Sequence, residues 1–219
     1  PEVAKLPRLG KTWQPRLEEI VQLQPDLVLV GRAPQVIQKL QALGLNVQEV
    51  DALSIEEVRS VLQRLDGLLD TQAAPAVIAA MDQKLDALRE QAAKIPAQRV
   101  YIELDAALYS AAPSSFIGEL LALLGAQNIA AASTTAYPKL SPEYVVQHAP
   151  ELIIQTYSQG AHAVHTRPGW HRIPALEHGR ICPLTAEERR IATRPGPRLA
   201  EAAEIFLRCL RMPYRERTP

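Results

Sequence analysis

The chain contains few cysteines and few aromatic residues, and it has no motif built on clustered cysteines. Of its 219 residues, two are cysteine, two are tryptophan, and the aromatic fraction is 5%. The two cysteines, Cys182 and Cys209, fit either one disulfide or two buried thiols, and their number does not fix the compartment. No C-x-x-C pair is present. A cysteine-bound cluster is therefore excluded.

The chain also lacks an excess of charge and a long apolar run. It carries 24 basic and 24 acidic residues, with no long run of one sign. Nucleic-acid binders usually show a basic stripe, so no nucleic-acid partner is expected. No stretch approaches 18 apolar residues, and the first residues are not a basic-then-apolar signal segment. We expect a mature or trimmed fragment that does not itself span a membrane.

Motifs of the common enzyme classes are missing as well. The sequence has no G-x-S-x-G elbow, no phosphate-binding P-loop and no H-E-x-x-H zinc motif. Adjacent glutamates occur at 18–19 and 56–57, each in the first turn of an expected helix. Carboxylates there interact with the helix dipole while remaining in water, so these pairs do not indicate acid–base catalysis. The sequence predicts a protein that is not an enzyme.

One helix-to-strand segment occurs twice. Residues 16–30 read RLEEIVQLQPDLVLV, and residues 141–155 read SPEYVVQHAPELIIQ. Pro15 suits the first helical position of the first copy, and Pro25 ends that helix before a buried strand. Each copy keeps a glutamate in its first turn, Glu18 and Glu143. The repeat predicts two similar halves.

Strands alternate with helices along both halves, which is typical of parallel sheets. Between them, residues 71–94 carry apolar residues at helical spacing and predict one long helix. The expected fold class is α/β, with two Rossmann-like lobes joined by that helix and a ligand cleft between them. The expected division is an N-terminal lobe at 1–70, a connecting helix at 71–96 and a C-terminal lobe at 97–219.

Loops that follow parallel strands are expected to face the ligand. Tyr109 and Tyr157 follow two predicted strands, and Trp13 and Tyr137 precede the two repeated helices. Flat rings at these places suit a large, planar, partly apolar ligand, although each ring could instead pack a lobe edge.

The loop after the second repeated strand contains two histidines, His162 and His165. An H-x-x-H pair could ligate a metal or a haem iron. The loop holds no neighbouring cysteine or carboxylate to complete a coordination shell. We therefore expect solvated histidines there.

A series of short motifs resembles a known family across nearly the whole chain. The sequence is similar to the substrate-binding proteins of bacterial ABC importers that carry cobalamin, haem or iron–siderophores, and the cobalamin-binding members match best. The matching motifs, in order, are TWQ at 12–14, L-E-x-I at 17–20, PDLV at 25–28, LxxLG at 40–44, VDAxSIEE at 50–57 and PR at 197–198.

The resemblance implies a monomeric periplasmic or extracytoplasmic binding protein with no cofactor of its own. Its cargo would be cobalamin, and it would contact the membrane only through an importer permease dimer. Glu18 and Glu143 would dock into arginine pockets of that permease. The family's ligand-site aromatic residues would fall on Trp13, Tyr109 and Tyr137. Gly31 and Tyr157 are expected at the same site because they follow predicted strands, although cobalamin-binding members carry a tryptophan where this chain has Gly31. The family places a strand, a helix and a strand before this region, so the first lobe is expected to be truncated.

The sequence leaves other functions open. Haem or a ferric siderophore is an alternative cargo, with His162, His165 or Tyr157 on the iron. A metal-ion binder would need a compact His/Asp/Glu shell that the sequence does not assemble. An enzyme acting on a metal cofactor across the cleft would need cluster cysteines or a phosphate loop. A truncated copy that has lost binding is the last alternative.

Overall fold

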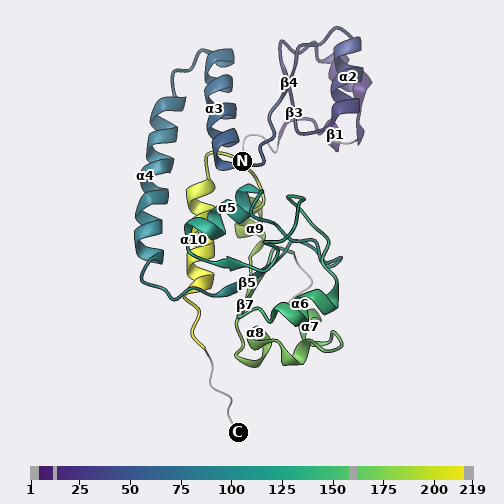
Figure 1. The fold of residues 1–219 in the computed structure, drawn as a ribbon. Coiled ribbons are helices and arrows are strands. Elements are labelled where there is room, and N and C mark those ends of the chain that lie inside the picture. Colours follow the sequence, from purple (N-terminus) through teal and green to yellow (C-terminus); the bar gives the residue numbers. More distant parts are fainter. Residues whose placement is uncertain (1–4, 12–13, 158–161, 215–219) are drawn as a thin grey trace. The chain divides into compact units, whose positions relative to one another are not determined.

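The computed structural model describes residues 5–11, 14–157 and 162–214 (Figure 1). The chain divides into two compact units, residues 1–51 and residues 52–219, called unit 1 and unit 2 below. Each unit is built on a parallel sheet and its helices, so the predicted α/β class is confirmed. The expected division at 1–70, 71–96 and 97–219 stays a prediction.

Unit 1 consists of two small strand pairs and two helices. Its hairpin is β1 (Gly10–Lys11) with β2 (Gln14–Pro15), and its parallel pair is β3 (Val28–Val30) with β4 (Val47–Glu49). The helices are α1 (Leu17–Gln22) and α2 (Pro34–Ala42). The core comprises Ile20, Val30, Val36, Leu40 and Val47.

The two helices of unit 1 test the helix boundaries that the sequence predicts. Pro34 occupies the start of α2, and the chain leaves that helix through Gly44 at φ +80°, a left-handed conformation that suits glycine. The expectation that Pro15 opens α1 is wrong. Pro15 pairs in β2, and α1 begins two residues later, after Arg16, which makes no side-chain cap.

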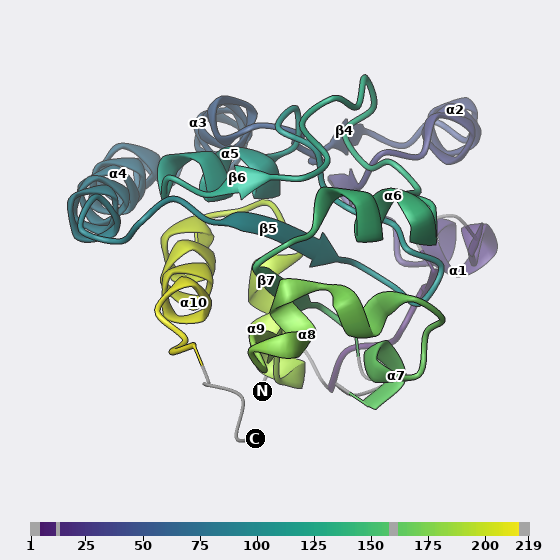
Figure 2. The same cartoon turned by 60° about the horizontal axis from the view of Figure 1, so that its bottom comes forward.

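Unit 2 is organised around a four-stranded parallel sheet with the order β6-β5-β7-β8. Alternate residues of the central strands face opposite sides. Val100 and Ile102 belong to the core that contains α4, α5 and α10, whereas Tyr101 and Ile153 belong to the core beneath α6 and α8. Figure 2 shows α4 and α10 grouped together, away from α6, α7 and α8. The strands are β5 (Arg99–Glu103), β6 (Gln127–Asn128), β7 (Leu152–Gln155) and β8 (Ile181–Pro183).

Four of the eight α-helices described in unit 2 begin at a capping hydroxyl. Ser54, Ser115, Ser141 and Thr185 each accept a backbone N–H of the first turn. The helices are α3 (Ile55–Leu69), α4 (Ala74–Ala92), α5 (Phe116–Leu123), α6 (Pro142–His148), α7 (His162–His165), α8 (Pro174–Glu177), α9 (Ala186–Ala192) and α10 (Leu199–Leu210), with a 3-10 turn, η2 (Trp170–Arg172).

The long helix expected at 71–94 is α4. Its buried residues Met81, Leu85 and Leu88 recur at helical spacing. They share the core of α10 and of strands β5 and β7. The long helix is thus an integral part of the unit 2 core.

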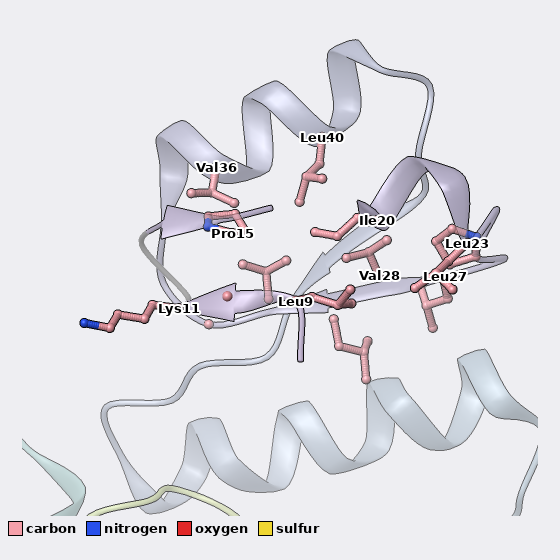
Figure 3. A pocket seen from close by; sticks show the side chains of 14 residues that line it. Leu9, Lys11, Pro15, Ile20, Leu23, Leu27, Val28, Val36 and Leu40 are labelled. Carbon is pink, nitrogen blue, oxygen red and sulfur yellow. The ribbon is translucent and has the colours of Figure 1, made fainter. Parts of the chain in front are cut away.

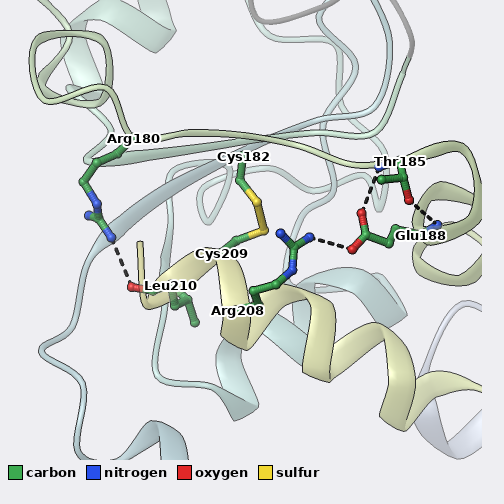
Figure 4. The surroundings of a disulfide bond; sticks show 7 residues. All are labelled: Arg180, Cys182, Thr185, Glu188, Arg208, Cys209 and Leu210. Carbon is green, nitrogen blue, oxygen red and sulfur yellow. Dashed lines mark hydrogen bonds and ion pairs between the residues drawn. A yellow bond between two sulfur atoms is a disulfide. The ribbon is translucent and has the colours of Figure 1, made fainter. Parts of the chain in front are cut away.

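The two cysteines form a disulfide, which settles the alternative that the sequence leaves open. Cys182 in β8 bonds to Cys209 in α10, 27 positions later, and both are buried (Figure 4). Next to the bond, the fully buried Arg180 donates hydrogen bonds to the carbonyls of Glu151, Leu210 and Met212. The disulfide and Arg180 together fasten the last helix to the sheet.

Candidate functional site

A buried polar network occupies the carboxyl edge of the unit 2 sheet, where β5 ends at Glu103 and β7 at Gln155. The Glu103 Oε1 atom accepts the Tyr157 hydroxyl at 2.9 Å and pairs with Arg167 Nη2 at 2.5 Å. The Gln155 side-chain amide donates to Glu103 Oε2 at 3.3 Å. Side chains from two other segments, at 155–157 and at Arg167, therefore converge on the Glu103 carboxylate.

Burial determines the electrostatics of this network. The Glu103 side chain is 0% exposed, so its charge needs a partner. Burial opposes the charge on Arg167, but the hydrogen bond and attraction to Glu103 outweigh it, and the pKa of Arg167 is raised. The pKa of Tyr157 is also raised, by burial first and then by Glu103. The Tyr157 hydroxyl is consequently held in its protonated form.

The same region contains polar atoms whose hydrogen-bonding capacity is not used. The Arg167 guanidinium lies over the Trp170 ring, 4.4 Å from its centroid. Within the described ranges, Arg167 Nη1, Trp170 Nε1, the Tyr101 hydroxyl and Gln155 Oε1 are buried without a hydrogen-bond partner. The ion pair between Glu103 and Arg167 lies directly beside these unpaired atoms.

Next to this network, two loop segments form an antiparallel ribbon. Its backbone hydrogen bonds join Leu140 to Leu108, Ser110 to Pro138 and Ala112 to Ala136, at 2.8 to 3.0 Å. Tyr109 and Lys139 stand directly opposite each other. The ribbon, residues 108–112 with 136–140, carries two of the predicted ligand residues, Tyr109 and Tyr137.

A tight turn presents Tyr109 at the end of β5. The Asp105 carboxylate accepts the backbone N–H groups of Ala107 and Tyr109, at 2.9 and 3.3 Å. Leu108 adopts φ +68°, which is uncommon for a leucine, and its side chain is buried. The Tyr109 carbonyl accepts the Leu104 N–H. The backbone of Tyr109 is thus fixed while its side chain remains 42% exposed.

The remaining predicted ligand residues lie in different surroundings. Tyr137 is half-buried and packs against the core of unit 2, and Tyr157 is half-buried in the Glu103 network. Gly31 follows β3 in unit 1. Trp13 lies outside the described residues.

The two histidines of the H-x-x-H pair fall in the short helix α7. His165 is exposed, and the side chain of His162 lies outside the described part of the chain. In the described part, no group of three or more His, Cys, Asp or Glu side chains is arranged to hold a metal ion. None of the helices there combines the length and apolar character that a bilayer crossing requires.

The repeated glutamates occupy equivalent places. Glu18 lies in the first turn of α1 and Glu143 in the first turn of α6, and both are exposed. Within the described ranges neither forms an ion pair or a hydrogen bond through its side chain. Both carboxylates are therefore available to a partner.

Unit 1 contains a hollow of about 340 Å³ among its core side chains (Figure 3). Ile20, Val36 and Leu40 line it together with strand β3 and Gly31. Lys11 provides its single charged side chain among the described residues. Such a lining can exclude water but can orient few polar groups of a ligand.

Sequence reasoning missed several of these features. Glu103, Asp105 and Arg167 belong to no short motif, and only the fold brings Glu103 and Arg167 together. A group of arginines was missed as well. Arg190, Arg194 and Arg198, which follow β8, line a hollow of about 340 Å³. Arg190 and Arg198 pair with Glu187, but within the described ranges Arg194 forms no ion pair.

Comparison with known proteins adds a family and several relatives. Residues 1–188 match the family described as periplasmic binding protein. An uncharacterized ABC transporter substrate-binding lipoprotein of Bacillus subtilis (strain 168) is 30% identical over 215 residues, which are 93% of this chain and 67% of that protein. A vitamin B12-binding protein of Salmonella paratyphi A is 33% identical over 161 residues, which are 70% of this chain and 60% of that protein.

A structural relative agrees with the fold. The crystal structure of the periplasmic heme binding protein of Vibrio cholerae superposes with a TM-score of 0.80 at 20% identity. The match covers 97% of this chain and 87% of that one. The present chain thus spans between 60% and 87% of the lengths of these three relatives.

Proposed function

Because the chain belongs to the periplasmic binding protein family, we propose that it is the extracytoplasmic solute-binding component of an ABC importer. Its proposed cargo is cobalamin or a related corrinoid. It binds and presents this cargo without catalysis and without a cofactor of its own. The relatives' names support the importer class, since they include an ABC transporter substrate-binding lipoprotein and a vitamin B12-binding protein.

The observation that carries the cargo proposal is the aromatic ribbon of unit 2. Tyr109 is held rigidly by its backbone and exposes its ring, and Tyr137 lies on the same ribbon. An aromatic side chain has only two rotatable bonds, so on a fixed backbone it binds a flat ring with a small loss of conformational entropy. The ribbon follows the carboxyl end of β5, the edge at which parallel α/β sheets usually bind ligands.

The Glu103 network favours a corrinoid over a cargo whose iron needs a protein ligand. Ferric iron binds tyrosine as the phenolate. The Tyr157 hydroxyl is committed to Glu103 and Arg167, and its raised pKa opposes ionisation. A corrinoid brings its own metal ligands and does not require a phenolate. Haem or a ferric siderophore remains the alternative cargo, and any open position on its iron would need a ligand other than Tyr157.

The two repeated glutamates are the proposed docking groups for the permease dimer. Each is exposed and lies at a helix start. A single exposed ion pair contributes only about 0–1 kcal/mol, so docking would require both glutamates and a matching surface shape. We propose a monomer that contacts the membrane only through this permease.

Charge reversal tests the docking role. The double variant Glu18→Arg/Glu143→Arg, reconstituted with the cognate permease in vesicles, is expected to lose cobalamin uptake while keeping its affinity for cobalamin in solution. Glu90→Arg, on an exposed residue late in α4, is the control and should transport normally. Normal uptake by the double variant would refute the docking role.

A further inference from the structure

The ribbon of unit 2 presents a lysine together with the two tyrosines. In an antiparallel pair, opposite residues share a face, and so do residues two positions further along. Tyr109 stands opposite Lys139. The hydrogen bond from Ala112 to Ala136 continues the pairing, which places Tyr137 opposite Ala111. One face of the ribbon therefore carries Tyr109, Lys139 and Tyr137.

Burial supports this assignment of faces. Leu108, Ala112 and Leu140, the residues of the other face, are buried in the core beneath α6 and α8. Ala111 belongs instead to the core on the α10 side, and Tyr137 packs against that same core. Tyr109 and Lys139 are exposed at the end of this face. The two exposed side chains thus lie next to each other, with Tyr137 diagonal to Tyr109.

The contacts of the Lys139 side chain do not indicate a role in stabilising the fold. Within the described ranges its ammonium group forms no ion pair and no hydrogen bond. It borders an open hollow of about 500 Å³ that is lined by residues 106–108 and 139–142. Small and apolar side chains dominate this lining, so Lys139 is the charged group that a molecule entering the hollow would meet.

We propose that Lys139 binds an anionic group on the edge of the flat ligand that Tyr109 and Tyr137 contact. This inference rests on the proposed function and specifies its ligand chemistry, a planar macrocycle with a peripheral phosphate or carboxylate. A corrinoid with its nucleotide carries a phosphodiester, and haem carries propionates. In both cases the ammonium donates charge-assisted hydrogen bonds, and the tyrosines fix the ring beside it.

Two pairs of ligands distinguish the contribution of the anionic group to binding from that of the ring, because one member of each pair lacks the anion. Cyanocobalamin is compared with dicyanocobinamide, which lacks the nucleotide and its phosphodiester, and haem is compared with its dimethyl ester. Lys139→Gln is expected to weaken binding of the anionic member of one pair about three- to tenfold and to leave its partner unchanged. The loss should shrink in high salt. Lys94→Gln, an exposed lysine before β5 at the opposite sheet edge, is the control and should change neither affinity.

The outcomes distinguish the inference from the proposed function. The pair in which the loss appears identifies the anion as phosphate or propionate. Unchanged affinities in Lys139→Gln, with binding by the wild type intact, would overturn the inference alone. An equal loss for both members of a pair would also overturn it, because Lys139 would then support the fold of the ribbon. Failure of the wild type to bind any of the four probes would overturn the proposed function and the inference together.

Discussion

Arg167 and Glu103 form an ion pair in which the carboxylate is completely buried and the guanidinium is stacked on Trp170. The Nη2–Oε1 distance is 2.5 Å, and the side chains are 18% and 0% exposed. Through Tyr157, the pair also connects the ends of β5 and β7. It supports the sheet edge at which we place the ligand.

Removing one member of this pair should be costly. Arg167→Met leaves the Glu103 carboxylate buried without its counter-charge, and we expect a loss of about 3–5 kcal/mol in the free energy of unfolding. The double variant Glu103→Gln/Arg167→Met should recover part of this loss, because no uncompensated charge remains. Urea unfolding followed by circular dichroism measures both. Arg190→Met breaks an exposed pair with Glu187 and should cost at most about 1 kcal/mol. Equal losses for Arg167→Met and Arg190→Met would contradict the importance of the buried pair.

Tyr157 should make stability depend on pH in the alkaline range. Its folded pKa is raised above the unfolded value of about 10, so the unfolded state loses its proton first. The stabilising contribution is complete below about pH 10 and is lost as pH rises further. Unfolding free energies between pH 8 and 11 should fall less steeply in Tyr157→Phe than in the wild type. Tyr109→Phe, on an exposed ring, is the matched control. An identical decline in all three proteins would refute the assignment.

The disulfide should account for a measurable share of the stability of unit 2. In the chain-entropy model, closing a loop of this length lowers the conformational entropy of the unfolded chain. This adds about 3.5 kcal/mol to the free energy of unfolding. Cys182→Ala/Cys209→Ala is therefore expected to lower the urea midpoint markedly. The wild type in reductant, which keeps both side chains, controls for lost packing and should be destabilised to a similar extent. A reduced protein as stable as the oxidised one would contradict this prediction.

Two helical glycines should respond in opposite ways to alanine. A Cβ at Gly118 in α5 would lie 2.0 Å from the Ala112 carbonyl oxygen, so Gly118→Ala must displace backbone and should cost at least about 2 kcal/mol. A Cβ at Gly67 in α3 meets nothing within 4 Å. Gly67→Ala should therefore stabilise by about 0.5–1 kcal/mol through lower unfolded-state entropy. Thermal unfolding distinguishes the two, and destabilisation by both variants would contradict the open surroundings of Gly67.

The sequence predicts the elements of the fold well because their signals are local. The repeated helix-to-strand segments, the long helix α4 and the stop at Gly44 all follow from spacing and from proline or glycine at the boundaries. Pro15 is the exception. A proline also fits the end of a short strand, and the pairing of β1 with β2 decides its position.

The site is harder to predict from the sequence because it depends on contacts between residues that are far apart along the chain. Glu103 appears in the sequence as the polar end of a strand, and only the convergence of β5, β7 and the segment at Arg167 makes it the centre of a network. Lys139 resembles any surface lysine until the register of the ribbon places it opposite Tyr109. The docking glutamates stay a prediction of the repeat and of the family resemblance.

Isothermal titration of the purified chain with cyanocobalamin, haem and a ferric siderophore tests the central claim most directly. We predict saturable binding of cyanocobalamin at one site, with weaker or no binding of the two iron ligands. Tyr109→Ala should lower the cyanocobalamin affinity, because the exposed ring is lost while its turn is held by backbone bonds. Absence of cyanocobalamin binding, or tight binding of haem with a tyrosinate–iron absorption band, would contradict the account.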